Sequence, residues 1–92
     1  MEEIRYPVID YVMTGKKLKA VCKDKNITAK ELQRLLNLGS VQAVYNWFGG
    51  ARLPNIDNLF AISKLLRVPM EDILVEGQKE APVFARLYGT IT

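Results

Sequence analysis

The sequence predicts an all-α fold of five short helices with short extended N- and C-terminal segments. Three observations lead to this prediction. Apolar residues recur at helical spacing in several segments, helix-capping side chains precede these segments, and glycine, asparagine or proline follows them. The chain has 92 residues, of which 49% are apolar and 25% charged. This length and composition suit one small globular domain.

The first helix is predicted to follow an extended lead-in over residues 1–13, a segment with Pro7 and several β-forming side chains. Thr14 is the expected N-cap of this helix. Apolar side chains then fall on one side of it, namely Leu18, Val21 and Cys22. Asn26 is a plausible stop, because asparagine tolerates a left-handed backbone.

The second and third helices are short and closely spaced. Thr28 and Glu31 have the spacing of a capping box, which predicts a second helix from about Ala29 to Asn37. Ser40 is the expected N-cap of the third helix, which ends at the glycine pair 49–50. The connection of about three residues predicts that the two helices cross at a steep angle.

The fourth helix is predicted to be the main core helix. Asn55 is its expected N-cap, and its wide apolar face comprises Ile56, Leu59, Phe60, Ile62, Ser63, Leu65 and Leu66. Pro69 can start a short fifth helix. From Gly77 the chain has the composition of a linker followed by a strand-like tail, so residues 77–92 are expected to form a dimerisation or packing segment.

Composition argues against an enzyme, a metal site and a cofactor. The chain has no histidine and a single cysteine, Cys22, so neither the usual zinc spacings nor an intramolecular disulfide can be assembled. Cys22 also lacks an ordinary base to activate it. The acidic start and the lack of an apolar run long enough to span a bilayer predict a cytoplasmic protein without a membrane partner.

Charge is distributed unevenly along the chain. Residues 14–34 hold seven basic and two acidic side chains, whereas residues 55–80 hold three basic and five acidic ones. This asymmetry suits a protein that presents one face to a polyanion. Charge alone is equally compatible with a solvated, lysine-rich helix.

Residues 14–74 resemble the lambda-repressor-like, Cro and Xre type, helix-turn-helix family of bacterial and phage DNA-binding proteins. The most specific segments are NITAKELQRLL, VYNW with its following glycine, and LPNIDNLFAISKLLRVPMEDIL. The resemblance implies a compact five-helix DNA-binding domain over residues 14–76, a transcriptional regulator of repressor type, and double-stranded DNA as partner. It also implies a homodimer, because one helix in one groove reads too few bases to be selective.

Three departures from the family pattern affect the expected docking. The segment between Leu36 and Val44 is one residue longer than the commonest form. Ala29 stands where several repressors carry a glutamine that braces the DNA contact. Phe48 and Gly49 stand where Glu and Arg or Lys are frequent, so one phosphate contact is expected to be missing.

The resemblance makes the third helix the recognition helix, with Val44 and Trp47 facing inward. The expected base contacts are Val41, Gln42, Tyr45 and Asn46. Gln42 can pair bidentately with adenine, and Asn46 can do the same or bind a phosphate. The expected phosphate contacts are Lys16, Lys17, Thr28, Lys30, Arg34, Ser40 and Arg52.

A second function stays open: a protein-interaction module, antitoxin-like or anti-repressor, that keeps the fold without specific DNA binding. The uncharged third helix would then be an interface patch. For the homodimer, the candidate contact segments are the tail after Gly77 and residues 6–12, which can equally fold back on their own monomer. No small-molecule ligand is indicated.

Overall fold

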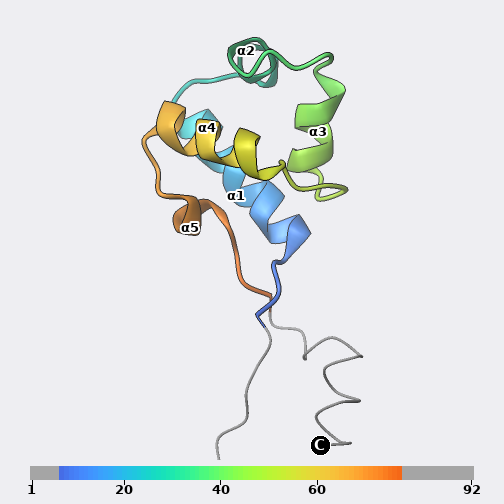
Figure 1. The fold of residues 1–92 in the computed structure, drawn as a ribbon, viewed down its shortest axis with the longest axis vertical. Coiled ribbons are helices and arrows are strands. Elements are labelled where there is room, and N and C mark those ends of the chain that lie inside the picture. Colours follow the sequence, from blue (N-terminus) through green and yellow to red (C-terminus); the bar gives the residue numbers. More distant parts are fainter. Residues whose placement is uncertain (1–6, 78–92) are drawn as a thin grey trace, which may run out of the picture.

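The computed structural model describes residues 7–77, which form five helices (Figure 1). Their bounds are α1 Tyr11–Asp24, α2 Ala29–Leu35, α3 Gln42–Phe48, α4 Ile56–Leu66 and α5 Met70–Ile73. The five predicted helices are therefore confirmed. Among the described residues no helix is both long and apolar enough to cross a membrane.

The prediction that Thr14 caps the first helix is wrong. α1 begins at Tyr11, because the carboxylate of Asp10 accepts a hydrogen bond from the backbone N–H of Met13 at 2.9 Å. Thr14 lies inside the helix and is buried, and its hydroxyl accepts from the backbone N–H of Val75 at 2.9 Å. Threonine is a common N-cap residue, but Thr14 instead binds a segment from the other end of the domain.

The capping box before α2 is confirmed, since Thr28 Oγ1 accepts from the N–H of Glu31 and the Glu31 carboxylate accepts from the N–H of Thr28. Asn26 has a φ of 59°, as its role as a stop requires. α2 ends at Leu35, slightly earlier than expected, and is followed by Asn37 in the left-handed region. Figure 1 shows α2 nearly end-on and α3 in the plane, so the predicted steep crossing is present.

Ser40 does not cap α3. The helix begins at Gln42, and its N-cap position is Val41, whose side chain makes no capping hydrogen bond. Ser40 therefore lies one residue before the N-cap position, outside the helix. The glycine pair at residues 49–50 ends α3 as predicted, with Gly50 at a φ of 82°.

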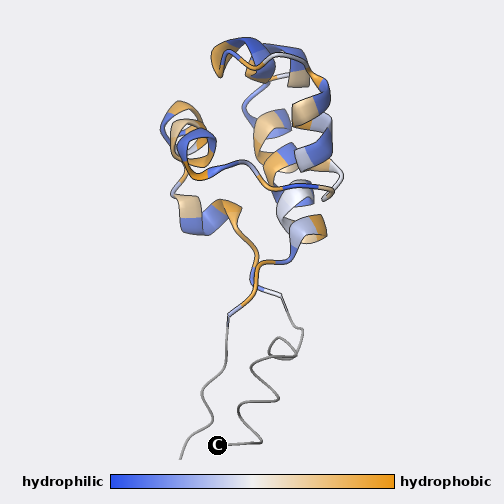
Figure 2. Ribbon diagram, turned by 45° about the vertical axis from the view of Figure 1, so that its right-hand side comes forward, coloured by the Kyte–Doolittle hydropathy of each residue, from blue (hydrophilic) through white to orange (hydrophobic). Residues whose placement is uncertain are grey.

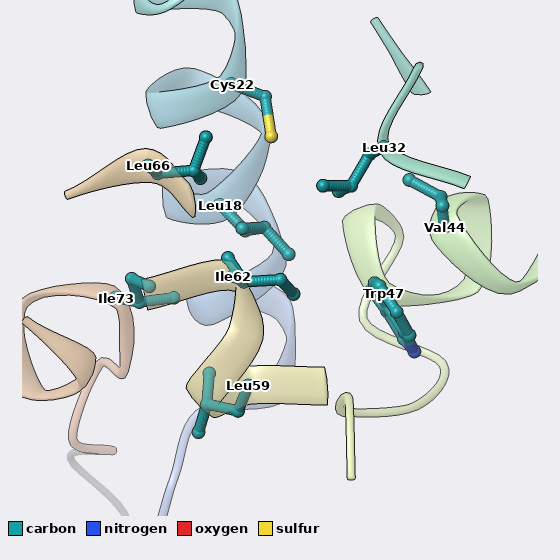
Figure 3. Close-up of a cluster of buried hydrophobic side chains, with 9 residues drawn as sticks. All are labelled: Leu18, Cys22, Leu32, Val44, Trp47, Leu59, Ile62, Leu66 and Ile73. Atoms are coloured by element: carbon teal, nitrogen blue, oxygen red, sulfur yellow. The ribbon is translucent and has the colours of Figure 1, made fainter. Parts of the chain in front are cut away.

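The core lies between α1, α4 and the pair α2–α3 (Figure 3). It consists of Leu18, Cys22, Leu32, Val44, Trp47, Leu59, Ile62, Leu66 and Ile73.

Asn55 caps α4 as predicted. The apolar face of α4 is narrower than expected, because Ile56, Phe60 and Leu65 are exposed. Figure 2 shows the resulting alternation of apolar and polar residues around the helices.

The two ends of the described chain lie side by side below the helices (Figure 1). Ile9 and Glu76 form an antiparallel bridge, flanked by backbone hydrogen bonds from Asp10 to Val75 and from Gly77 to Val8, both 2.8 Å. Of the extended lead-in predicted over residues 1–13, residues 7–10 are non-helical, residues 11–13 belong to α1, and residues 1–6 lie outside the described residues. The predicted role of the tail falls, except for Gly77, outside the described residues.

Candidate nucleic-acid interface

α3 has one buried side and one exposed side, as the sequence predicts. Val44 and Trp47 are 0% and 6% exposed, and both belong to the core (Figure 3). Gln42 and Tyr45 are exposed on the opposite side, Tyr45 by 53%, with Asn46 partly exposed beside them. Val41 precedes the helix and is half-buried. The exposed surface of α3 therefore carries amide and phenol groups and no charge.

α3 is held against α1 by a very close backbone approach. A Cβ atom added to Gly15 would lie 2.2 Å from the carbonyl oxygen of Trp47 and 2.6 Å from that of Phe48. A Cβ at Gly50 would lie 2.7 Å from the Cα of Val12. The C-terminal end of α3 is thus seated on the first half of α1. Sequence reasoning did not single out Gly15; an isolated glycine inside a helical pattern is the signal that could have found it.

Two of the predicted base-contact residues are hydrogen-bonded to each other. Gln42 Nε2 donates to Asn46 Oδ1 at 3.0 Å, one helical turn further along the exposed face. Asn46 also borders an open hollow of about 360 Å³ between α3 and the start of α4. The hollow is lined by Ala43, Asn46, Trp47, Arg52, Leu53, Asn55 and Asn58. Of these, Asn46 and Arg52 were predicted contacts and the other five were not.

The predicted cationic contacts do not all lie on one side. Lys16 follows Val12 by one turn on the flank of α1 that meets the end of α3. Lys17 is about 100° further round the helix than Lys16. Lys30 and Arg34 are exposed and share one face of α2, and Arg52 is exposed beside the hollow. The structure therefore places Arg52 beside α3, and helical spacing puts Lys16 and Lys17 on different flanks of α1.

The two predicted hydroxyl contacts differ in their availability. Thr28 donates its hydroxyl proton to the Glu31 carboxylate at 3.2 Å, and its backbone N–H is bonded to the same group. These hydrogen bonds from Thr28 hold the pKa of Glu31 below its ordinary value, so the carboxylate stays charged at neutral pH. A phosphate that binds at Thr28 would have to displace the Glu31 carboxylate. The Ser40 side chain is exposed at the turn before α3.

Cys22 is buried in the core, and burial raises the pKa of its thiol to about 11. The thiol therefore stays protonated at neutral pH and is a poor nucleophile. Within residues 7–77 no group of three or more cysteine, aspartate, glutamate or histidine side chains is placed to hold a metal ion.

A comparison with protein families matches residues 18–73 to the family described as Helix-turn-helix. This match covers more than half of the chain. No curated protein matches it.

Several solved structures share the fold. The restriction-modification controller protein C.AhdI from Aeromonas hydrophila aligns with a TM-score of 0.63 and 20% identity, over 70% of this chain and 96% of that one. A transcriptional regulator from Listeria innocua aligns with a TM-score of 0.63 and 14% identity, over 85% and 72% of the two chains.

The c2 repressor of P22, solved in complex with a synthetic operator, aligns with a TM-score of 0.61 and 28% identity, over 66% of this chain and 91% of the repressor chain. With the family match and five helices in the expected order, these similarities identify the chain as a member of the lambda-repressor-like, Cro and Xre type, helix-turn-helix family of DNA-binding domains.

Proposed function

We propose that this protein is a sequence-specific transcriptional regulator that reads the major groove of double-stranded DNA with α3. The observation that carries the proposal is the division of α3 into a side buried by Val44 and Trp47 and an exposed, uncharged side with Gln42, Tyr45 and Asn46. Directional hydrogen bonds to base edges specify a sequence, whereas charge supplies general affinity. The likeness to the P22 c2 repressor, which was solved with an operator, supports the same use of the fold.

Base contacts are proposed for Gln42, Tyr45 and Asn46, and for Val41 through its methyl groups. Phosphate contacts are proposed first for Arg52, which lines the hollow beside α3, and for Lys16, which follows Val12 by one turn of α1. Lys30, Arg34 and Ser40 are exposed and can extend the contact around the turn between α2 and α3. Lys17 and Thr28 are weaker candidates, because Lys17 is about 100° round α1 from Lys16 and Thr28 is bonded to Glu31.

The regulator is proposed to act as a homodimer. A single α3 has two helical turns and reaches few base pairs, which is too few to select one site in a genome. Two copies would read half-sites whose centres are about 34 Å, or one turn of DNA, apart. Selected duplexes would then contain an inverted repeat.

The test is selection of bound duplexes from a random pool, followed by affinity measurements over a range of salt concentrations. Gln42→Ala is expected to cost about 1 to 3 kcal/mol at the best site and to relax one base position. Arg52→Ala is expected to weaken all duplexes alike and to reduce the salt slope by about one. Lys64→Ala is the charge-matched control, because Lys64 is exposed on α4 and is not among the proposed phosphate contacts.

A binding constant that falls steeply with salt supports the proposal, because phosphate contacts release counterions. Absence of any duplex binding at low salt contradicts it and favours the protein-interaction module.

A further inference from the structure

The hydrogen bond between Gln42 and Asn46 constrains how Gln42 can meet a base. The two side chains lie one turn apart on the exposed side of α3, and Gln42 Nε2 donates to Asn46 Oδ1 at 3.0 Å. A glutamine amide can turn over by 180°, which exchanges its oxygen and its nitrogen. With Asn46 as acceptor, the nitrogen of Gln42 faces Asn46 and the oxygen faces away.

The constrained amide keeps one acceptor and one donor for a base. Its NH₂ group has two hydrogens, of which one is bonded to Asn46, so a second N–H and the oxygen Oε1 are available. In the major groove adenine offers the N6 amino donor beside the N7 acceptor, whereas guanine offers two acceptors, O6 and N7. The amide of Gln42 in this state is complementary to adenine.

The same bond limits what Asn46 itself can do. Its Oδ1 accepts a hydrogen bond from Gln42 through one of its two lone pairs, so one lone pair and the Nδ2 donors remain. A bidentate contact between Asn46 and adenine would have to share Oδ1 with Gln42. The bond therefore favours an arrangement in which Gln42 contacts the base and Asn46 holds the Gln42 amide in position.

We propose that Asn46 is a positioning residue, which holds the Gln42 amide in the orientation that selects adenine; this inference rests on the proposed function. The chain has Ala29 on α2, whose methyl group cannot hydrogen-bond to Gln42, so the support comes from α3 itself. In an isolated helix a side-chain pair of this kind raises the equilibrium constant for helix formation about 1.5- to 2-fold. In a complex the effect is larger, because a side chain already held in place loses less freedom on binding, and the expected gain is about three- to tenfold.

The experiment is a double-mutant cycle on the best duplex and on the same duplex with the Gln42-dependent base pair replaced. The proteins are the wild type, Gln42→Ala, Asn46→Ala and the variant with both substitutions. Asn46→Ala is expected to weaken binding about three- to tenfold in the wild type and less than about twofold in the Gln42→Ala background. It is also expected to reduce the preference for adenine.

Asn46→Asp is the matched variant. Its carboxylate can still accept from Gln42 Nε2, but it adds a negative charge near the DNA. It is expected to lower affinity for both duplexes alike and to keep the ratio between them. Circular dichroism of all variants checks that helix content is unchanged.

The outcomes separate this inference from the proposed function. If Asn46→Ala lowers the affinity equally in the wild type and in the Gln42→Ala variant, the positioning role is overturned. DNA binding by α3 is not affected by that result. A lost adenine preference in Asn46→Asp likewise overturns the positioning role. If the wild type binds no duplex, the proposed function fails and this inference fails with it.

Discussion

Replacing Gly15 with alanine tests the contact that seats α3 on α1. In an ordinary helix interior this change is favourable by about 1 kcal/mol, because alanine has the higher helix propensity. Gly15 lies inside α1, five residues from its start. Propensity alone therefore predicts that Gly15→Ala stabilises the protein.

The packing around Gly15 reverses the sign of the expected change in stability. The new Cβ would lie 2.2 Å and 2.6 Å from the carbonyl oxygens of Trp47 and Phe48, which belong to the backbone at the end of α3. A side chain could rotate away, but these carbonyls move only if α3 moves. Overpacking typically costs about 1 to 3 kcal/mol, and an approach this close to backbone atoms takes the upper end of that range, so the net loss of stability is about 2 kcal/mol. For a domain of this size the melting temperature falls by about 8 to 16 °C.

The assay is urea unfolding followed by fluorescence of Trp47, the one tryptophan of the chain, and by circular dichroism. Gly39→Ala is the matched control, because a Cβ at Gly39 would have no atom within 4 Å and its φ is not in the left-handed region. This control should leave the free energy of unfolding unchanged or raise it by up to about 1 kcal/mol. A Gly15→Ala protein as stable as the wild type would refute the close approach of α1 and α3.

Three further predictions concern the remaining buried or capped groups. Thr14→Val removes the acceptor of the Val75 N–H and should lower the free energy of unfolding by about 1 to 3 kcal/mol in urea titrations, with a smaller loss for Thr14→Ser. The hydrogen bonds from Thr28 lower the pKa of Glu31 below 4.5, so its stabilising contribution is present above that ordinary pKa and is lost as pH falls through the lowered value. Thermal melts between pH 7 and pH 2 should therefore show a smaller acid loss for Glu31→Gln than for the wild type, and parallel curves would contradict this. Burial raises the pKa of the Cys22 thiol to about 11, so a thiol reagent should label it only as the protein unfolds, and rapid labelling without denaturant would show that the core is more open than described.

Most of the fold could be predicted because it depends on interactions between residues close in sequence. The capping box of Thr28 and Glu31 joins residues three apart, and Asn55 caps α4 through a bond to the N–H of Asn58, also three residues away. Asn26 ends the first helical segment by its own backbone preference. The inward placement of Val44 and Trp47 likewise follows from helical periodicity.

The errors arose where a residue has a partner far away in the chain or a neighbour that changes its position. Thr14 has the side chain of an N-cap, but Asp10 caps α1 and Thr14 binds Val75, 61 residues later. Ser40 lies outside α3, because the helix begins at Gln42 with Val41 in the N-cap position. Ile56, Phe60 and Leu65 are apolar, but the face that α4 buries holds only Leu59, Ile62 and Leu66.

The sequence by itself determined the number and order of the helices, the caps at Thr28 and Asn55 and the two sides of α3, because these depend on local hydrogen bonds and on the helical period. The tertiary structure decided that Thr14 binds Val75, that Gly15 seats the end of α3, and that Arg52 lies beside α3. It also paired Gln42 with Asn46. These features depend on distances and directions between side chains that helical spacing alone does not specify, because they are set when separate helices pack and side chains choose among rotamers.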